Sequence, residues 1–303
     1  MKRMICYAAL ACALSCAPVS SAAEDAEAVI IAPKGAPAAE ALDWHVGSQA
    51  YTFNHYTFFE AVDKVKALGL HYIEAYPGQT LSKEDGDAKF EHGMSAELQK
   101  KALDYLKAAD VKLMNYGVVG IENKEVEARK VFDFAKAMGI ETIVSEPTFD
   151  SFDLLDTLTE EYGINIAIHN HPEPSRYWNP DILLEHVKDH NKRIGACADT
   201  GHWQRSGIDP VEALKKLEGR VISFHVKDLN EFGVHEAHDV PWGTGVGNLR
   251  GVLAEMQRQG FKGVFSAEYE HKWTESLPDL ALSVANFNAI AESLTELQQA
   301  KKN

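Results

Sequence analysis

Short apolar runs alternate with segments of helical periodicity from residue 44 to the end of the chain. The runs are rich in β-branched and other apolar residues, as expected of strands that are buried on both faces of a parallel sheet. The intervening segments carry apolar residues at the period of a helix with one buried face. Strands are predicted at 45–51, 71–76, 111–116, 141–146, 165–169, 194–199, 221–226 and 263–268. Helices are predicted at 58–68, 96–109, 124–138, 152–162, 180–189, 210–217, 249–259 and 279–297.

Helix-ending and helix-starting residues support these boundaries, because glycines follow several of the segments and capping residues precede others. Eight strands alternating with eight helices predict an α/β protein with a single (β/α)8 TIM barrel. An open doubly wound sheet is the alternative. It usually has a glycine-rich phosphate turn after the first strand, and here that strand is followed by Thr52-Phe53-Asn54-His55. The ending residues are Gly69, Gly139, Gly163 and Gly260, and the starting residues are Ser95, Asn123, Asn179 and Asp209.

Charge narrows the range of partners. The 303 residues include 45 Asp and Glu but only 30 Lys and Arg, which gives a formal net charge of −15. A surface this acidic repels phosphate backbones and anionic lipids, so neither nucleic acid nor a membrane surface is an expected partner. No stretch is long and apolar enough to predict stable insertion in a membrane.

The N-terminus has the pattern of a cleaved secretory signal over residues 1–23. Lys2 and Arg3 precede an uncharged apolar segment at 4–16, and small residues at 21–23 suit a signal peptidase. Cys16 leaves lipidation as a weaker alternative. We therefore expect a secreted or periplasmic protein with a flexible leader at 24–43 and a catalytic barrel at 44–300. Cys197 is the one cysteine outside the signal, so no internal disulfide is expected.

Carboxylates and imidazoles gather at the predicted carboxyl ends of the strands, which is where a (β/α)8 barrel builds its active site. So many ionisable groups at one mouth are costly unless something neutralises them, and a divalent cation is the simplest candidate. Mixed oxygen and imidazole ligands suit transition metals better than Ca²⁺. The residues are Glu74, Glu146, His169, His171, Asp199, His202, His225, Lys227, Asp228, Glu268 and Glu270.

Four segments together resemble the sugar phosphate isomerase/epimerase family of xylose isomerase-like barrels. The similarity extends over about residues 44–295. It implies relatives such as ketose 3-epimerases, inosose dehydratases, hydroxypyruvate isomerases and lyases that cleave 3-keto-glycosides. Relatives are usually dimers or tetramers, so the resemblance is compatible with a homo-oligomer. The segments are Ala198-Asp199-Thr200-Gly201-His202, Ser223-Phe224-His225-Val226-Lys227-Asp228, Val240-Pro241-Trp242-Gly243-Thr244-Gly245-Val246-Gly247 and Ser266-Ala267-Glu268-Tyr269-Glu270.

The resemblance implies a divalent metal, with Mn, Co, Zn, Fe and Mg all candidates. Relatives typically hold it with Glu, Asp, His and Glu from the last four strands. Asp199, His225 and Glu268 match the last three. The fifth strand has no matching Glu, because His169 stands nearest and His171 follows two residues later. We therefore expect Glu146 and His171 to join Asp199, His225 and Glu268 as metal ligands.

The same resemblance gives candidate catalytic and substrate-binding residues. Proton abstraction next to a sugar carbonyl would give a metal-stabilised enediolate, which can end in epimerisation, isomerisation or β-elimination. The candidate acids and bases are Glu146, His169, His202, Lys227 and Glu268. The candidate substrate contacts are Tyr51, Glu74, Trp203 and Trp242.

The histidine on the fifth strand favours elimination, since imidazole is well suited to protonate a leaving group near neutral pH. Export favours a non-phosphorylated keto-sugar or 3-keto-glycoside as the substrate. The sequence thus predicts a metal-dependent sugar isomerase/epimerase-type enzyme that ends in a lyase or hydratase reaction. A ketose epimerase, an aldose–ketose isomerase and a non-catalytic carbohydrate-binding barrel remain the alternatives.

Overall fold

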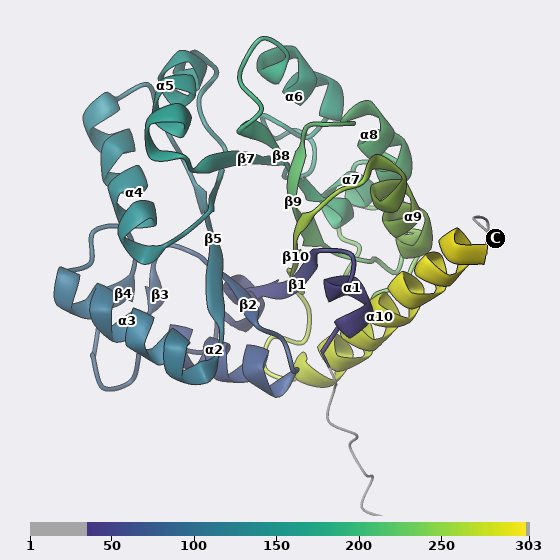
Figure 1. Cartoon of the computed structure of the whole chain (residues 1–303), viewed down its shortest axis with the longest axis horizontal. Coiled ribbons are helices and arrows are strands. Elements are labelled where there is room, and N and C mark those ends of the chain that lie inside the picture. Colours follow the sequence, from purple (N-terminus) through teal and green to yellow (C-terminus); the bar gives the residue numbers. More distant parts are fainter. Residues whose placement is uncertain (1–34, 301–303) are drawn as a thin grey trace, which may run out of the picture. The chain divides into compact units, whose positions relative to one another are not determined.

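A closed barrel of parallel strands with helices on its outside is the core of the structure, a computed structural model that describes residues 35–300 (Figure 1). Within this range the barrel order is β1-β10-β9-β8-β7-β6-β5-β2, with a separate hairpin, β3-β4. The predicted (β/α)8 barrel is confirmed. The barrel strands are β1 (Trp44–Gln49), β2 (Tyr72–Ala75), β5 (Lys112–Val119), β6 (Thr142–Ser145), β7 (Asn165–His169), β8 (Ile194–Asp199), β9 (Val221–Val226) and β10 (Gly263–Ala267), and the hairpin strands are β3 (Gln79–Thr80) and β4 (Lys89–Phe90).

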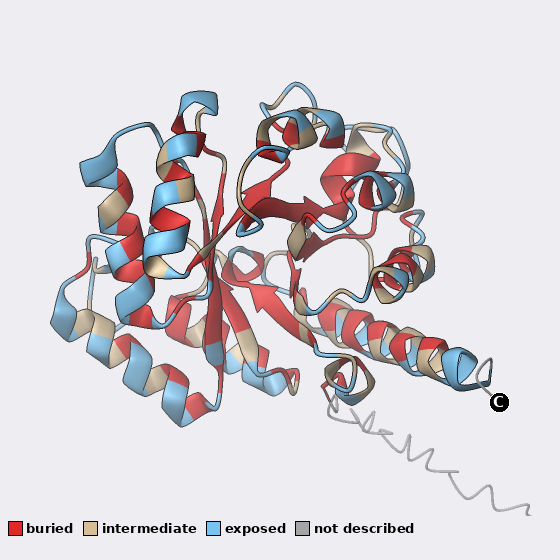
Figure 2. Cartoon of the chain, turned by 45° about the horizontal axis from the view of Figure 1, so that its top comes forward, coloured by how far each residue is buried: buried red, intermediate tan, exposed pale blue. Residues whose placement is uncertain are grey.

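The helices turn their buried residues towards the strands and their exposed residues outward (Figure 2). Several begin at the caps expected from the sequence. The side chains of Ser95, Asn179 and Asp209 accept backbone N–H groups at these positions. Asn123 does not cap α4, which begins after Lys124, and Thr57 forms with Glu60 a capping box that was not predicted from the sequence. The helices are α1 (Pro37–Glu40), α2 (Phe58–Ala67), α3 (Ala96–Ala109), α4 (Glu125–Met138), α5 (Phe152–Tyr162), α6 (Pro180–Val187), α7 (Thr200–Arg205), α8 (Pro210–Lys216), α9 (Leu249–Gln259) and α10 (Leu277–Ala300), with 3-10 turns η1 (Ala50–Phe53) and η2 (Phe149–Ser151).

The short helix α1 corrects the predicted domain boundary. Residues 35–43 were expected to belong to a flexible leader, yet α1 packs against α10, where the backbone N–H of Ala38 donates to Asn288 Oδ1 at 2.8 Å. Ala39 is fully buried. The ordered domain therefore begins before residue 44. The signal expected at 1–23 and the leader up to residue 34 lie outside the described residues.

Three further elements escape the sequence pattern because they are short. The β3–β4 hairpin follows β2, and α7 follows β8 directly. A helix of this length shows no apolar period. None of the helices in the described range is long and apolar enough to cross a membrane.

The interior of the barrel has an apolar layer and a polar layer. Val144, Ala167 and Cys197 form a small buried cluster in the interior of the barrel. Cys197 is a free thiol, as expected. The polar layer lies at the carboxyl ends of the strands, so the chemistry of the molecule is concentrated at one mouth.

Gly195 allows β8 to approach β9 closely, and this gives a test of the barrel packing. A Cβ at Gly195 would lie 2.1 Å from the Arg220 carbonyl oxygen, whereas a Cβ at Gly120 would have no atom within 4 Å. We expect Gly195→Ala to lower the free energy of unfolding by about 1–3 kcal/mol, because backbone must move. Gly120→Ala should change it by less than about 1 kcal/mol. Urea denaturation measures both, and equal stabilities would contradict the packing described here.

Candidate metal centre and active site

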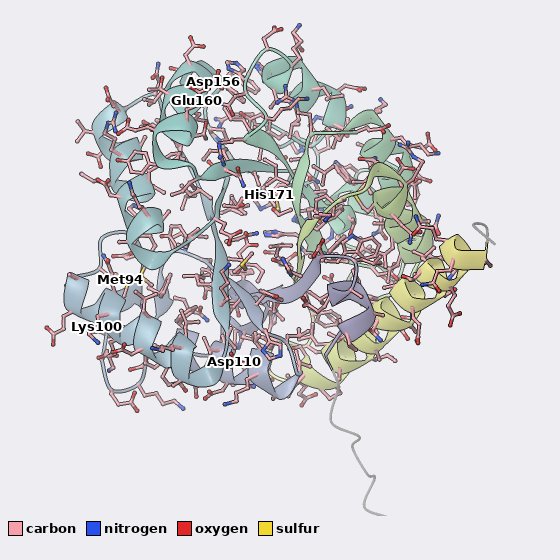
Figure 3. The ribbon with its side chains drawn as sticks, viewed as in Figure 1. Met94, Lys100, Asp110, Asp156, Glu160 and His171 are labelled. Carbon is pink, nitrogen blue, oxygen red and sulfur yellow. The ribbon has the colours of Figure 1, made fainter. Side chains whose placement is uncertain are left out.

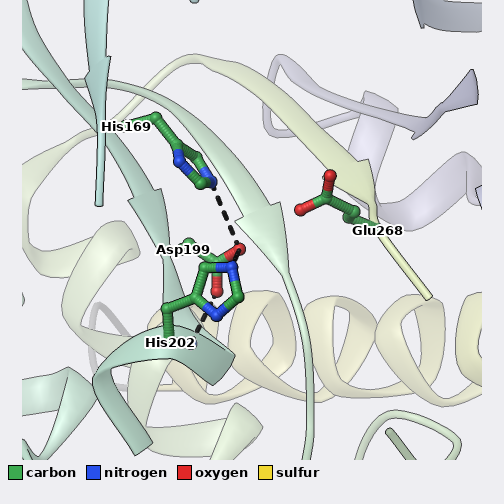
Figure 4. Close-up of side chains that lie close together, drawn as sticks. All are labelled: His169, Asp199, His202 and Glu268. Atoms are coloured by element: carbon green, nitrogen blue, oxygen red, sulfur yellow. Dashed lines mark hydrogen bonds and ion pairs between the residues drawn. The ribbon is translucent and has the colours of Figure 1, made fainter. Parts of the chain in front are cut away.

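Four side chains from the last half of the barrel meet at its mouth (Figure 4). His169 ends β7, Asp199 ends β8, His202 lies in α7 and Glu268 follows β10. Each offers a ligand atom within 4.8 Å of the others. The parallel register places His225 directly opposite Asp199, so β9 contributes to the same cluster.

Two of the histidines are each held from one side by a carboxylate. His225 Nε2 lies 2.8 Å from Glu74 Oε1, and His169 Nδ1 lies 3.2 Å from Glu146 Oε1. The opposite ring nitrogens, His225 Nδ1 and His169 Nε2, are buried and have no hydrogen-bond partner within residues 35–300. A carboxylate that binds one imidazole nitrogen and leaves the other free is the usual arrangement of metal-ligating histidine.

The free nitrogens face the carboxylates of the cluster. His169 Nε2 lies 3.4 Å from Asp199 Oδ2, and His225 Nδ1 lies 3.0 Å from Glu268 Oε2 without the angle of a hydrogen bond. Two imidazoles and two carboxylates form a donor set suited to Zn²⁺, Mn²⁺ or Fe²⁺. These residues therefore fit a divalent metal.

Glu74 lies beneath this donor set and is fully buried. Its carboxylate accepts hydrogen bonds from Gln49 Nε2 at 3.2 Å, Asn115 Nδ2 at 3.2 Å and Ser266 Oγ at 2.9 Å, in addition to its contact with His225. The structure corrects the expectation that Glu74 binds substrate. All of its polar contacts are internal, and they fix the orientation of His225.

Lys227 lies between the two carboxylates of the cluster. Its Nζ is 2.6 Å from Asp199 Oδ2, 3.5 Å from Glu270 Oε2, and in contact with Glu268 Oε2. Burial alone would lower the pKa of Lys227, but the negative charges of Asp199 and Glu268 raise it well above its usual value. Gly201 makes room for this side chain, because a Cβ there would lie 2.5 Å from Lys227 Cβ.

The ammonium in turn keeps the carboxylates charged. Burial would raise the pKa of Glu268, but Lys227 and then His225 hold it well below its usual range. The mouth therefore already holds a positive charge between two ionised carboxylates.

Glu146 and His171 lie on the Nδ1 side of His169, and Figure 3 shows His171 over the barrel interior. Glu146 Oε1 contacts both imidazoles. Although burial opposes ionisation, these contacts lower the pKa of Glu146 to about 2. The sequence placed Glu146 and His171 in one ligand set with Asp199 and Glu268. The structure separates the two groups across the ring of His169, so that Glu146, His169 and His171 form a cluster of their own.

A cavity of about 230 Å³ has one member of the candidate donor set, Glu268, in its lining. Tyr51 stands at its rim and packs edge-to-face on Tyr76 and Trp273, with ring centroids 5.2 Å and 5.8 Å apart. These two aromatic neighbours were missed, because nothing in their spacing marks a loop residue as part of a rim. The lining residues are Gln49, Tyr51, Tyr76, Pro77, Gly117, Val118, His171, His202, Glu268 and Glu270.

Trp203 and Trp242, which were expected to stack on a sugar, are core residues instead. Both are at most 2% exposed and neither lines the cavity. Trp242 packs against Phe287 of α10, and its indole N–H donates to the Val226 carbonyl at 3.2 Å. A sequence cannot distinguish an aromatic residue that faces a barrel mouth from one that faces the surrounding helices.

The comparisons with known proteins agree with this geometry. A family model described as a xylose isomerase-like TIM barrel matches residues 62–295. The chain belongs to this family. The expected resemblance to xylose isomerase-like barrels is thereby confirmed, while none of the curated proteins matches the chain.

Several solved structures are similar to this chain over most of its length. An uncharacterised protein from Parabacteroides distasonis is 30% identical, with coverage of 81% of this chain and 98% of that one and a TM-score of 0.66. An L-ribulose 3-epimerase is 13% identical, with coverage of 85% and 98% and a TM-score of 0.65. The IolI protein with a bound zinc atom is 18% identical, with coverage of 83% and 96% and a TM-score of 0.60. At such identities the last two share the fold alone.

Asp239, buried beside Lys227 and Arg205, links the mouth to the stability of the fold. Burial raises its pKa to about 7, although Lys227 and Arg205 oppose this. The folded protein thus retains a proton between about pH 4 and 7 that the unfolded chain releases, so this group makes stability fall as pH rises through that window.

We expect Asp239→Asn to remove the fall in folding stability that Asp239 causes as pH rises. The variant should gain up to a few kcal/mol relative to wild type between pH 5 and pH 8, because each unit of pKa shift is worth about 1.4 kcal/mol. Urea melts at each pH measure the difference, with Asp181→Asn on the exposed surface of α6 as the control. A difference between wild type and Asp239→Asn that does not change with pH would contradict the prediction.

Proposed function

We propose that this xylose isomerase-like barrel is an exported, metal-dependent enzyme that removes a proton next to the carbonyl of a non-phosphorylated keto-sugar. The specific reaction that we propose is elimination from a 3-keto-glycoside. The observation that carries the proposal is the convergence of His169 Nε2 and His225 Nδ1, each buried without a hydrogen-bond partner among the described residues, on Asp199 and on Glu268, which also lines the cavity.

The proposed metal ligands are His169, Asp199, His225 and Glu268. A divalent cation bound there would polarise the sugar carbonyl and make the adjacent C–H more acidic. Glu74 and Glu146 would hold the two imidazoles in the orientation that this requires. The identity of the metal stays open among Mn, Co, Zn, Fe and Mg.

Two groups that line the cavity are placed to act as base and acid. Glu268 is ionised and lines the cavity, so it can accept a proton from the carbon next to the carbonyl. His171 also lines the cavity, and its Nδ1 contacts the ionised Glu146. As an imidazolium stabilised by that carboxylate, it would carry a second proton on Nε2, which it would give to the leaving-group oxygen. A base and an acid in one cavity are what β-elimination needs.

The charge of the cavity supports a substrate without phosphate. Glu268 and Glu270 are the charged residues of its lining, and Lys and Arg are absent from that lining among the described residues. Two carboxylates would repel a sugar phosphate, whereas they can accept hydrogen bonds from sugar hydroxyls. The proposal that the chain is exported rests on the sequence pattern of residues 1–23 alone. Export would favour the same class of substrate, a sugar without phosphate.

Metal affinity tests the donor set. We expect His169→Gln to weaken Zn²⁺ binding by more than about 100-fold, because a ligand is lost, and Glu74→Gln to weaken it by about 10–100-fold, because the support of a ligand is lost. Titration calorimetry with Zn²⁺ on the protein lacking residues 1–23 measures both. Glu255→Gln, a largely buried carboxylate on α9, is the control. Wild-type affinity in both site variants would refute the donor set.

Proton NMR in D₂O tests the reaction. We expect the metal-loaded protein to erase the signal of the hydrogen beside the ketone of a 3-keto-glucoside and to release the aglycone. His171→Gln should keep the exchange and slow the release by about 100-fold or more, since it removes only the acid. Exchange without release in the wild type would indicate an epimerase or isomerase. Binding without exchange would indicate a carbohydrate-binding barrel.

A further inference from the structure

The imidazole of His202 meets an arginine on one of its two sides. α7 begins immediately after Asp199, whose Oδ1 accepts the backbone N–H of His202 at 2.7 Å. One helical turn later, Arg205 Nη1 lies 3.0 Å from His202 Nδ1. A guanidinium has only donors and remains protonated, so the nitrogen that it contacts must be the acceptor. The ring proton of a neutral His202 is therefore on Nε2.

Arg205 is itself held firmly in place. Its Nε donates to the Ala237 carbonyl at 3.1 Å, and Nη1 also reaches Glu270 Oε2 at 3.3 Å. Nη2 lies 3.5 Å from the buried Asp239 Oδ2, and only 12% of the side chain is exposed. These contacts come from two separate segments after α7, the loop that follows β9 and the loop that follows β10. They leave the guanidinium in one position, with a donor aimed at His202 Nδ1.

The contact with Arg205 requires His202 to be neutral, because a doubly protonated ring would place an N–H of its own against a guanidinium N–H. His202 Nε2 lies 3.6 Å from Asp199 Oδ2, which is too far for a hydrogen bond. The Nε2–H is thus a free donor at the wall of the cavity.

We propose that Arg205 is a positioning residue that locks His202 as the Nε2–H tautomer, so that His202 donates a hydrogen bond to a sugar oxygen and does not ligate the metal. The distances alone place His202 within reach of the donor set. A ring nitrogen that bears a proton has no lone pair for a cation, so the contact with Arg205 separates His202 from His169 and His225.

This assignment gives His202 a specific use. A neutral imidazole N–H can stabilise the negative charge that develops on a carbonyl oxygen without transferring its proton. The role at the sugar oxygen rests on the proposed function, whereas the tautomer does not. The two parts can therefore be tested separately.

Nitrogen NMR on the histidine rings tests the tautomer directly. In protein labelled with ¹⁵N-histidine and lacking residues 1–23, long-range ¹H–¹⁵N correlations should show His202 with an unprotonated Nδ1 and a protonated Nε2. His202→Gln identifies these signals by their loss. On addition of Zn²⁺ alone, His202 should keep its pattern. A protonated Nδ1 in the wild type, or loss of the Nε2 proton when Zn²⁺ binds, would overturn the proposal.

Variants of Arg205 test the cause. In Arg205→Met the preference for the Nε2–H tautomer should weaken, and Arg205→Lys should restore part of it, because an ammonium still donates. Arg193→Met, at the opposite end of β8, is the matched control and should leave the signals unchanged. If Arg205→Met folds and leaves the His202 pattern unchanged, Arg205 does not set the tautomer.

Kinetics tests the use of the donor. With a substrate that the wild type turns over, Arg205→Met should lower kcat by about tenfold to 100-fold and change KM by less than about threefold, because the donor acts mainly in the transition state. Equal losses in kcat for Arg205→Met and Arg193→Met would overturn this part. Absence of turnover in the wild type would refute the proposed function instead, and the NMR result would still decide the tautomer.

Discussion

Burial of opposite charges in contact is the constraint on which the mouth of the barrel depends. Asp199, Lys227 and Glu268 all lie out of water, and each would be costly there alone. The ammonium between the two carboxylates removes most of this cost. The same requirement explains the neighbouring glycine at position 201, since any side chain there would exclude Lys227. Loss of Lys227 would leave two buried carboxylates without the ammonium that compensates them.

A second layer of contacts determines what each histidine can do. Glu74 contacts one ring nitrogen of His225, and Glu146 contacts one ring nitrogen of His169, so that the other nitrogen of each ring faces the centre of the mouth. Arg205 instead donates a hydrogen bond to Nδ1 of His202. The imidazoles of His169, His225 and His202 thus divide into two metal-ligand candidates and one hydrogen-bond donor. The residue type alone does not distinguish them.

The sequence predicted the architecture well and the site in part. All eight barrel strands were predicted, because strands buried on both faces carry a strong apolar pattern, and the clustering of Asp199, His225 and Glu268 follows from parallel strands ending at one mouth. The supporting residues were missed. Three of them, Gln49, Asn115 and Ser266, are polar residues within otherwise apolar strands, and each donates a hydrogen bond to Glu74. A polar residue in such a strand is a signal from which a supporting role could have been predicted. Arg205 carried no signal, since its partners come from loops distant in sequence.

The position of Lys227 has a consequence for how the protein matures. With its ammonium between Asp199 and Glu268, Lys227 offsets part of the negative charge of the mouth without any ion from solution. Folding therefore does not need a cation at this position, and the proposed metal would bind after the barrel has formed. For a chain proposed to reach its final form outside the cytoplasm, this makes assembly independent of how much metal that compartment supplies.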